Sequence, residues 1–159
     1  MPYTRICVAA ALQRYLDFTP IAARIRDLAR VLALADNARV SVVSVEAPVE
    51  LLPEVETMTE KLDRYAEPLL AAGIEVEVVL REGRPSREIA DFVGASEADV
   101  LIIGSHSKRG ALDVGLGSTA SALMNDLEVT VIMVRPTEGE QEQARALMIP
   151  KYPVVFPYG

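Results

Sequence analysis

Short apolar runs rich in Val and Ile alternate along this chain with longer segments in which apolar residues recur every three or four positions. The runs, which we interpret as strands, are 5–9, 39–45, 74–80, 100–103 and 129–134. Runs 39–45 and 74–80 alternate polar with apolar residues, so we expect them toward an edge of the sheet. Runs 100–103 and 129–134 are nearly all apolar, and we expect at least the first of them at the centre, buried on both faces.

Helical signals fill the intervals between these runs. Thr19-Pro20 predicts an N-cap followed by proline at the first helical position, for a helix that runs to about Asp36. Three more helices are expected, from near Pro53 to Gly73, from 84–86 onward, and from Gly117 past Leu123. The alternation of strands and helices predicts an α/β fold, with a five-stranded parallel sheet covered by helices on both faces.

We expect one domain over residues 1–136. With right-handed crossovers, the commonest order of five parallel strands is 3-2-1-4-5. Beyond this domain, residues 137–143 have the composition of a solvated acidic stretch, and residues 149–158 are rich in proline and aromatic residues. We expect 137–159 to be an extended C-terminal tail. Because the prolines of its second part disfavour a helix, we expect 149–158 to be an extended arm that is disordered, or that lies on its own domain or on a neighbouring subunit.

Composition excludes several classes of function. The 159 residues carry a formal net charge of −7, which argues against binding to nucleic acid. No apolar run reaches the roughly 18 residues of a membrane span, and the N-terminus lacks the layout of a signal peptide. The single cysteine, Cys7, lies in an apolar run, so we expect a buried side chain and a reducing compartment. A cytoplasmic protein is therefore expected.

The most informative segment is 104–119, which follows a predicted central strand and leads into a helix. Its glycines allow a ligand to approach the backbone, and Ser118 and Thr119 add hydroxyl donors beside the free N–H groups of a helix start. This pattern favours a phosphate cradle; the alternative is a crossover loop in which Ser118 or Thr119 only caps the helix. The segment leaves the sheet where the expected strand order reverses, which favours the cradle. It matches neither a Rossmann glycine motif nor a P-loop.

Catalytic and metal-ligating patterns are sparse. His106 is the only histidine, and with no Ser-His-Asp or Cys-His set available we interpret it as a polar contact rather than a catalyst. Metal ligands of the Cys/His kind are not indicated, so we assign no metal site and no catalytic residue. A magnesium ion held by carboxylates is compatible with a bound nucleotide, although no spacing of acidic residues singles one out.

Several motifs together resemble the universal stress protein family across residues 5–135. The nucleotide-binding members carry G-x2-G-x9-G-[ST] after the fourth strand. Serine replaces the second glycine in this chain, and the motif falls on Gly104, Ser107, Gly117 and Ser118. The segments 82–85, 98–105 and 131–135 are also similar to the family. The resemblance implies the adenine nucleotide alpha hydrolase-like fold, and a stress-response protein that binds ATP, with or without Mg²⁺, as a regulatory ligand.

The resemblance also implies a set of nucleotide-binding residues. The phosphates are expected on Gly104, Ser107, Gly117, Ser118 and Thr119. The base is expected near Ala9, Ala10 and Val40. The same site is expected to include the flanking residues Ile103 and His106, with Lys108 and Arg109 near enough in sequence to offset phosphate charge.

Two departures from the family pattern leave a second function open. ATP-binding members carry Asp after the first strand, whereas this chain has Ala11; the following loop is longer than usual, so Arg14 or Asp17 could compensate. The alternative is a signalling or scaffold dimer that has lost nucleotide binding. ATP hydrolysis is the least favoured activity, because no general base is evident.

The resemblance further implies a homodimer. Strand 129–134 is expected at the edge of the sheet, where an apolar strand leaves backbone N–H and C=O groups to be paired. An antiparallel two-fold contact between two copies of this strand closes as a symmetric dimer. The tail 144–159 begins near enough in sequence to reach the partner and clasp it. No downstream protein partner is indicated.

Overall fold

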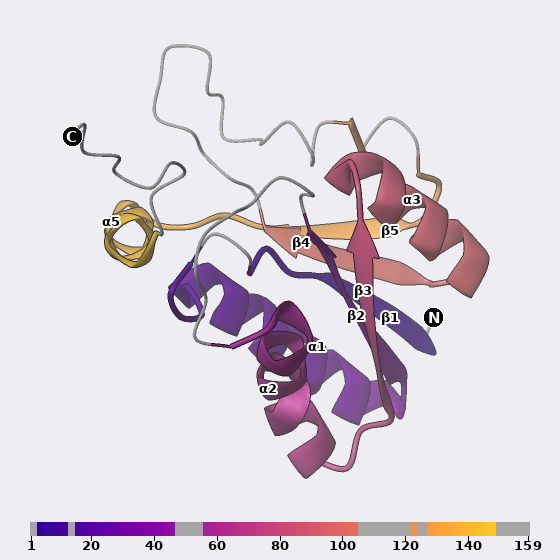
Figure 1. Cartoon of the computed structure of the whole chain (residues 1–159). Coiled ribbons are helices and arrows are strands. Elements are labelled where there is room, and N and C mark those ends of the chain that lie inside the picture. Colours follow the sequence, from indigo (N-terminus) through magenta and orange to yellow (C-terminus); the bar gives the residue numbers. More distant parts are fainter. Residues whose placement is uncertain (1–2, 13–14, 47–55, 105–121, 124–126, 149–159) are drawn as a thin grey trace, which may run out of the picture.

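The structure, a computed structural model, describes residues 3–12, 15–46, 56–104, 122–123 and 127–148. Its strands are β1 (Arg5–Ala9), β2 (Arg39–Glu46), β3 (Val76–Glu82), β4 (Val100–Gly104) and β5 (Thr130–Val134). Its helices are α1 (Pro20–Asp36), α2 (Met58–Ala71), α3 (Pro85–Ser96) and α5 (Glu138–Leu147). Figure 1 shows a layered α/β arrangement of these elements.

All five strands run parallel in one sheet of order β3-β2-β1-β4-β5, which confirms the predicted order. β1 lies between β2 and β4, with Ile6 opposite both Val40 and Val100. The central position predicted for run 100–103 is confirmed, because all four of these residues are buried. β3 and β5 form the two edges of the sheet (Figure 1).

Two apolar cores lie on opposite faces of the sheet. Even-numbered residues of the inner strands, such as Val8 and Ile102, belong to the core shared with α1 and α2. Odd-numbered residues, such as Cys7 and Leu101, belong to the core shared with α3 and Leu123. This division follows from the opposite directions of successive side chains in a strand. Helices therefore cover both faces, as predicted, with α1 and α2 together on one of them (Figure 1).

Capping side chains set the boundaries of the helices. α1 begins after its N-cap Thr19 and spans the residues predicted from the sequence. α2 begins at Met58 rather than near Pro53. The reason is a capping box, in which Thr57 accepts a hydrogen bond from the N–H of Glu60 (3.1 Å) while the Glu60 carboxylate accepts one from the N–H of Thr57 (2.8 Å).

The C-terminal segment differs from the sequence-based expectation. Residues 138–147, which the sequence pattern assigned to an extended tail, form helix α5, and this helix starts with a capping box between Thr137 and Glu140. None of its residues is buried, so the apolar periodicity that predicts the other helices is weak here. α5 packs against α1 of its own chain. Residues 149–159, the rest of the expected tail, lie outside the described residues.

Three smaller expectations also have an outcome. Leu123 is helical and buried in the core on the α3 face, as predicted, whereas the expected helix start at Gly117 lies outside the described residues. Cys7 is fully buried, which confirms its interpretation as a core residue. Among the described helices, none combines the length and the apolar character needed to cross a membrane.

Candidate functional site

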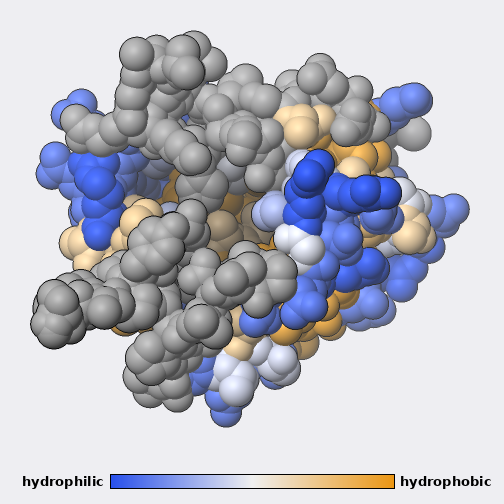
Figure 2. All heavy atoms as spheres, turned by 45° about the horizontal axis from the view of Figure 1, so that its top comes forward, coloured by the Kyte–Doolittle hydropathy of each residue, from blue (hydrophilic) through white to orange (hydrophobic). Residues whose placement is uncertain are grey.

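The strand order reverses beside β1, because its neighbours β2 and β4 are reached by connections on opposite faces of the sheet. The chain leaves the carboxyl end of β1 toward α1 on one face, and after β4 it reaches Leu123 on the other face. In doubly wound α/β proteins, ligands bind at this point, beyond the carboxyl ends of the strands. Figure 2 is turned to bring this end of the sheet toward the viewer, and apolar residues are visible there between segments drawn in grey.

The residues that end β1 are small and uncharged. Ala9 and Ala10 are buried, and Ala11 is exposed. The N–H of Ala10 donates to the carbonyl of Val43 on β2 (3.0 Å), and the carbonyl of Ala10 accepts from the hydroxyl of Ser44 (2.8 Å). Ser44 is almost fully buried, so its hydroxyl fixes the last residues of β1 against β2. In the sequence, the only signal for Ser44 is a polar residue among valines.

Gly104 ends β4 next to the same switch point. A Cβ atom added at this glycine would lie 3.1 Å from Cδ1 of Ile25 and 3.2 Å from Cγ1 of Ile21, both on α1. The glycine therefore allows α1 to pack closely against the end of β4. Ile103, one residue earlier, pairs with Ala9 and is buried on the opposite face. The structure thus brings together Ala9, Ala10, Ile103 and Gly104 of the predicted site.

Val40 is the predicted site residue that the structure does not bring to this end. It pairs with Ile6 and Val76 near the amino end of β2 and is buried in the core under α1 and α2. The β2 residue opposite Ala9 is Val43, three positions further along. With a rise of about 3.3 Å per residue, Val40 lies roughly 10 Å along β2 from Val43, the residue opposite the end of β1. Sequence reasoning placed the strand correctly but not the position along it.

The other predicted nucleotide contacts fall outside the described residues. They are His106, Ser107, Lys108, Arg109, Gly117, Ser118 and Thr119. Their assignment to a phosphate cradle stays a prediction from the sequence motif. The described structure contributes the position of the segment, which begins directly after Gly104 at the switch point.

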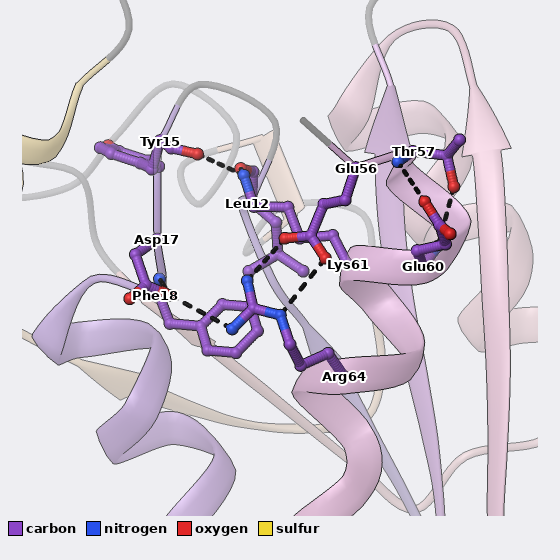
Figure 3. A network of polar contacts seen from close by, with 9 residues as sticks. All are labelled: Leu12, Tyr15, Asp17, Phe18, Glu56, Thr57, Glu60, Lys61 and Arg64. Carbon is purple, nitrogen blue, oxygen red and sulfur yellow. Dashed lines mark hydrogen bonds and ion pairs between the residues drawn. The ribbon is translucent and has the colours of Figure 1, made fainter. Parts of the chain in front are cut away.

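A buried lysine holds the loop that follows β1. Lys61, in the first turns of α2, is 5% exposed, and its Nζ donates to the carbonyl oxygens of Leu12 (2.8 Å) and Tyr15. Figure 3 shows this ammonium group reaching from α2 into the loop. Bonds from a charged donor are roughly twice as strong as neutral ones, so they tie the loop firmly to α2. Lysine is rarely buried, and the apolar stripe of α2 gave no reason to expect it there.

Asp17, considered above as a substitute for the family's Asp, is engaged on the α2 side of the loop. Its Oδ1 accepts from the N–H of Phe18 (2.8 Å) and from Arg64 (3.3 Å), and both bonds hold its pKa below the usual range, with the Phe18 bond the larger cause. Arg64 also binds Glu56 (2.6 Å) and lies over the ring of Phe18 at 4.3 Å (Figure 3). Arg14, the other residue considered, lies outside the described residues.

Reactive groups in the described part of the chain are few. Burial, with a smaller contribution from the charge of Glu77, raises the pKa of the Cys7 thiol to about 12, so this cysteine is unreactive near neutral pH. Within the ranges that the structure describes, no three His, Cys, Asp or Glu side chains gather in a way that would hold a metal ion. The described residues that end β1 and β4 therefore contribute small side chains and no titratable group.

Comparison with known proteins agrees with this fold. Universal stress protein MJ0531 of Methanocaldococcus jannaschii is 28% identical over 68 residues, which cover 43% of this chain and 40% of that relative's length. A universal stress protein crystallised in complex with cAMP has a TM-score of 0.67 at 19% identity, with 86% of this chain and 100% of that chain covered. The universal stress protein from Archaeoglobus fulgidus in complex with dAMP has a TM-score of 0.64 at 22% identity, with 85% and 100% covered.

The similarity extends over the whole α/β unit. Both solved structures share the fold at low identity, and the curated relative adds sequence similarity over part of the chain. The model of the universal stress protein family matches residues 3–135, which run from the residues just before β1 to the end of β5. The chain belongs to the universal stress protein family.

Proposed function

We propose that this protein binds an adenine nucleotide as a regulatory ligand in a stress response, at the carboxyl end of the sheet between β1 and β4. The observation that carries the proposal is the position of the switch point, where β1 and β4 end side by side in the small residues Ala9, Ala10 and Gly104. Two of the similar universal stress proteins form complexes, one with cAMP and the other with dAMP. ATP is the nucleotide that we expect here, from the resemblance of the loop motif.

The expected contacts divide between the described and undescribed parts of the site. The base would lie against the small residues that end β1, with Val43 and Ser44 as their neighbours on β2. The phosphates would lie at the helix start that the sequence predicts at Gly117, because the first N–H groups of a helix favour an anion. A described edge without bulky or acidic side chains at Ala9, Ala10 and Gly104 suits a polyanionic ligand, and Mg²⁺ would arrive with its phosphates.

Calorimetry tests the proposal. The full chain is titrated with ATP, ADP and AMP, with and without Mg²⁺, and at least one nucleotide is expected to bind. Gly117→Val is expected to abolish binding and leave the fold intact, because a β-branched side chain blocks both positive φ and the approach of the ligand. Gly94→Val, at an exposed position of α3 with open space around the added atoms, is the matched control.

A second candidate function is a signalling or scaffold dimer without nucleotide. Ala11 is exposed and supplies no carboxylate where ATP-binding relatives carry one, and Oδ1 of Asp17 is already engaged by Arg64. Calorimetry without heat at millimolar ATP and Mg²⁺, together with protein that purifies free of nucleotide, would favour this function over the first.

Both functions include a homodimer formed through β5. This edge strand reads Thr130-Val-Ile-Met-Val134, and its three middle residues are half-buried in the single chain. An apolar edge strand is stabilised when a second copy pairs with it. Light scattering at micromolar concentration is expected to give twice the mass of one chain. Ile132→Lys should reduce it to one, whereas Leu80→Lys, on the opposite edge strand β3, should not.

A cytoplasmic location completes the proposal. The only cysteine is buried and unpaired, which suits a reducing compartment. Fractionation of cells that express the chain checks this expectation: the protein should appear with the cytoplasmic fraction, and recovery from a secreted or membrane fraction would contradict it.

A further inference from the structure

Helix α5 lies beyond the family match, which ends at residue 135, and it contacts the segment that leads out of the candidate site. The N–H of Leu16 donates to the carbonyl of Leu147 at the end of α5 (2.8 Å). Next to this bond, Tyr15 and Met148 form an antiparallel bridge. The C-terminal helix is therefore joined by backbone pairing to the loop after β1, the same loop that Lys61 holds from α2.

Arg24 of α1 fixes the start of α5. Its guanidinium donates to the carboxylate of Glu140 (2.7 Å) and to the carbonyl of Arg135 (3.3 Å), so it binds the connection between β5 and α5 as well as the helix itself. Glu140 is also the capping residue of α5, and its side chain is mostly shielded from solvent. One arginine thus secures the N-terminal end of α5, while backbone pairing secures its C-terminal end.

The two supports of the loop differ in strength. Lys61 is buried and donates from a charged group, whereas α5 contains no buried residue, and only Glu140, Gln141, Ala144 and Leu147 in it are half-buried. Elements with few buried contacts open at low free-energy cost. α5 is therefore the support that detaches first, and its detachment frees the loop from one side only.

We propose that α5 is a latch within the same chain, whose docking on the loop after β1 raises the affinity of the neighbouring site for an adenine nucleotide. The inference rests on the proposed function and deepens it by naming a regulator of that site. A loop that is already held in one conformation loses less conformational entropy when the ligand binds. Docking of α5 therefore favours binding. By linkage, bound nucleotide must favour docked α5 to the same extent.

The test separates docking from charge. Arg24→Glu places a carboxylate against Glu140 and should release α5, whereas Arg145→Glu makes the same change of charge on α5 at an exposed residue that pairs with Glu142 within the helix. Arg24→Lys keeps a positive charge beside Glu140, so α5 should stay docked in this variant. Hydrogen exchange at the Leu16 amide reports docking, because this N–H is bonded to Leu147. Calorimetry with ATP, ADP and AMP reports affinity.

Arg24→Glu is expected to speed exchange at Leu16 and to weaken nucleotide binding by about five-fold or more, the lower end of typical coupling between sites. Arg145→Glu should change neither, and nucleotide should slow exchange at Leu16 in the parent chain. Equal affinity in the two Glu variants, with exchange at Leu16 faster only in Arg24→Glu, overturns the latch and leaves the proposed function standing. Unchanged exchange at Leu16 in Arg24→Glu also overturns it. A parent chain that binds no nucleotide contradicts the proposed function itself, and the latch with it.

Discussion

The two ends of the sheet are built differently. At the amino end, Oδ2 of Asp99 accepts three hydrogen bonds, from the N–H and hydroxyl of Thr4 (both 2.7 Å) and from the N–H of Arg5 (2.8 Å). At the carboxyl end, β1 and β4 finish in the small, uncharged residues Ala9, Ala10 and Gly104, and the loop after β1 is held by groups that come from α2 and α5. The amino end has a carboxylate that binds the first residues of the chain's central strand β1, whereas the carboxyl ends of β1 and β4 carry no charged side chain.

This difference indicates which residues contribute to the stability of the fold alone and which also contribute to ligand affinity. Polar side chains at the amino end satisfy the backbone groups of strands that start there, so changes at this end should affect unfolding and leave ligand affinity alone. Changes around the loop after β1 should affect both. The predictions below test this division, beginning with the largest effect.

The largest effect is expected at Lys61. Lys61→Met removes a buried ammonium group that binds two loop carbonyls, and should lower the free energy of unfolding by about 3 kcal/mol. Because the freed loop borders the proposed site, nucleotide affinity should also fall, by roughly ten-fold. Urea denaturation and calorimetry measure the two quantities. A loss of stability with unchanged affinity would show that the loop does not shape the site.

A gain in affinity is expected from Ala11→Asp. The residue is exposed at the end of β1, so the added carboxylate enters without a packing cost. One charged hydrogen bond contributes roughly 1.5–3 kcal/mol, which corresponds to about a 10- to 100-fold tighter binding of ATP with Mg²⁺. Ala95→Asp, at an exposed position of α3, controls for the added charge. Weaker binding in Ala11→Asp would mean that the longer loop forms a different site.

At the amino end, Asp99→Ala should destabilise the fold without affecting the nucleotide. The substitution removes the acceptor of three hydrogen bonds at an exposed position, and we expect a loss of about 2 kcal/mol in the free energy of unfolding. Affinity for the nucleotide, measured well below the unfolding temperature, should match the parent. Reduced affinity in this variant would show that the two ends are coupled.

The smallest expected effect is the pH dependence that Asp99 gives to the free energy of unfolding. The hydroxyl of Thr4, together with the N–H groups of Thr4 and Arg5, holds the pKa of Asp99 below its ordinary value. A carboxyl with a lower pKa in the folded state contributes stability at neutral pH, and this stability is lost as the pH falls from about the unfolded value, roughly 3.9, through the lower pKa of the folded state. The stability difference between parent and Asp99→Asn should therefore shrink between about pH 5 and pH 3. A constant difference would contradict this role.

The sequence predicted the frame of the molecule better than its details. Regular apolar runs and the Thr19-Pro20 signal were enough for the strand order and for α1. The position of Val40 along β2 was not predictable, because strand periodicity fixes the face of a residue but not its distance from the strand end. The burial of Lys61 was not predictable from the sequence, because it depends on carbonyl groups of a loop that is distant along the chain.

Helix α5 shows a second kind of limit. Its residues are mostly polar, and none is buried, so hydrophobic periodicity carries little information. The capping box between Thr137 and Glu140 was present in the sequence and was the signal that could have located the helix. Its contacts with Arg24 and with Leu16 are tertiary and had no sequence signature.

The most direct test of the division between the two ends is a titration of the full chain with ATP and Mg²⁺, followed by the chemical shifts of its backbone amides. The account predicts shifts concentrated at the carboxyl end, at Ala10, Ser44 and Gly104, with Thr4 and Arg5 at the amino end unchanged. An absence of shifts at millimolar ATP, or shifts centred on the amino end, would contradict it.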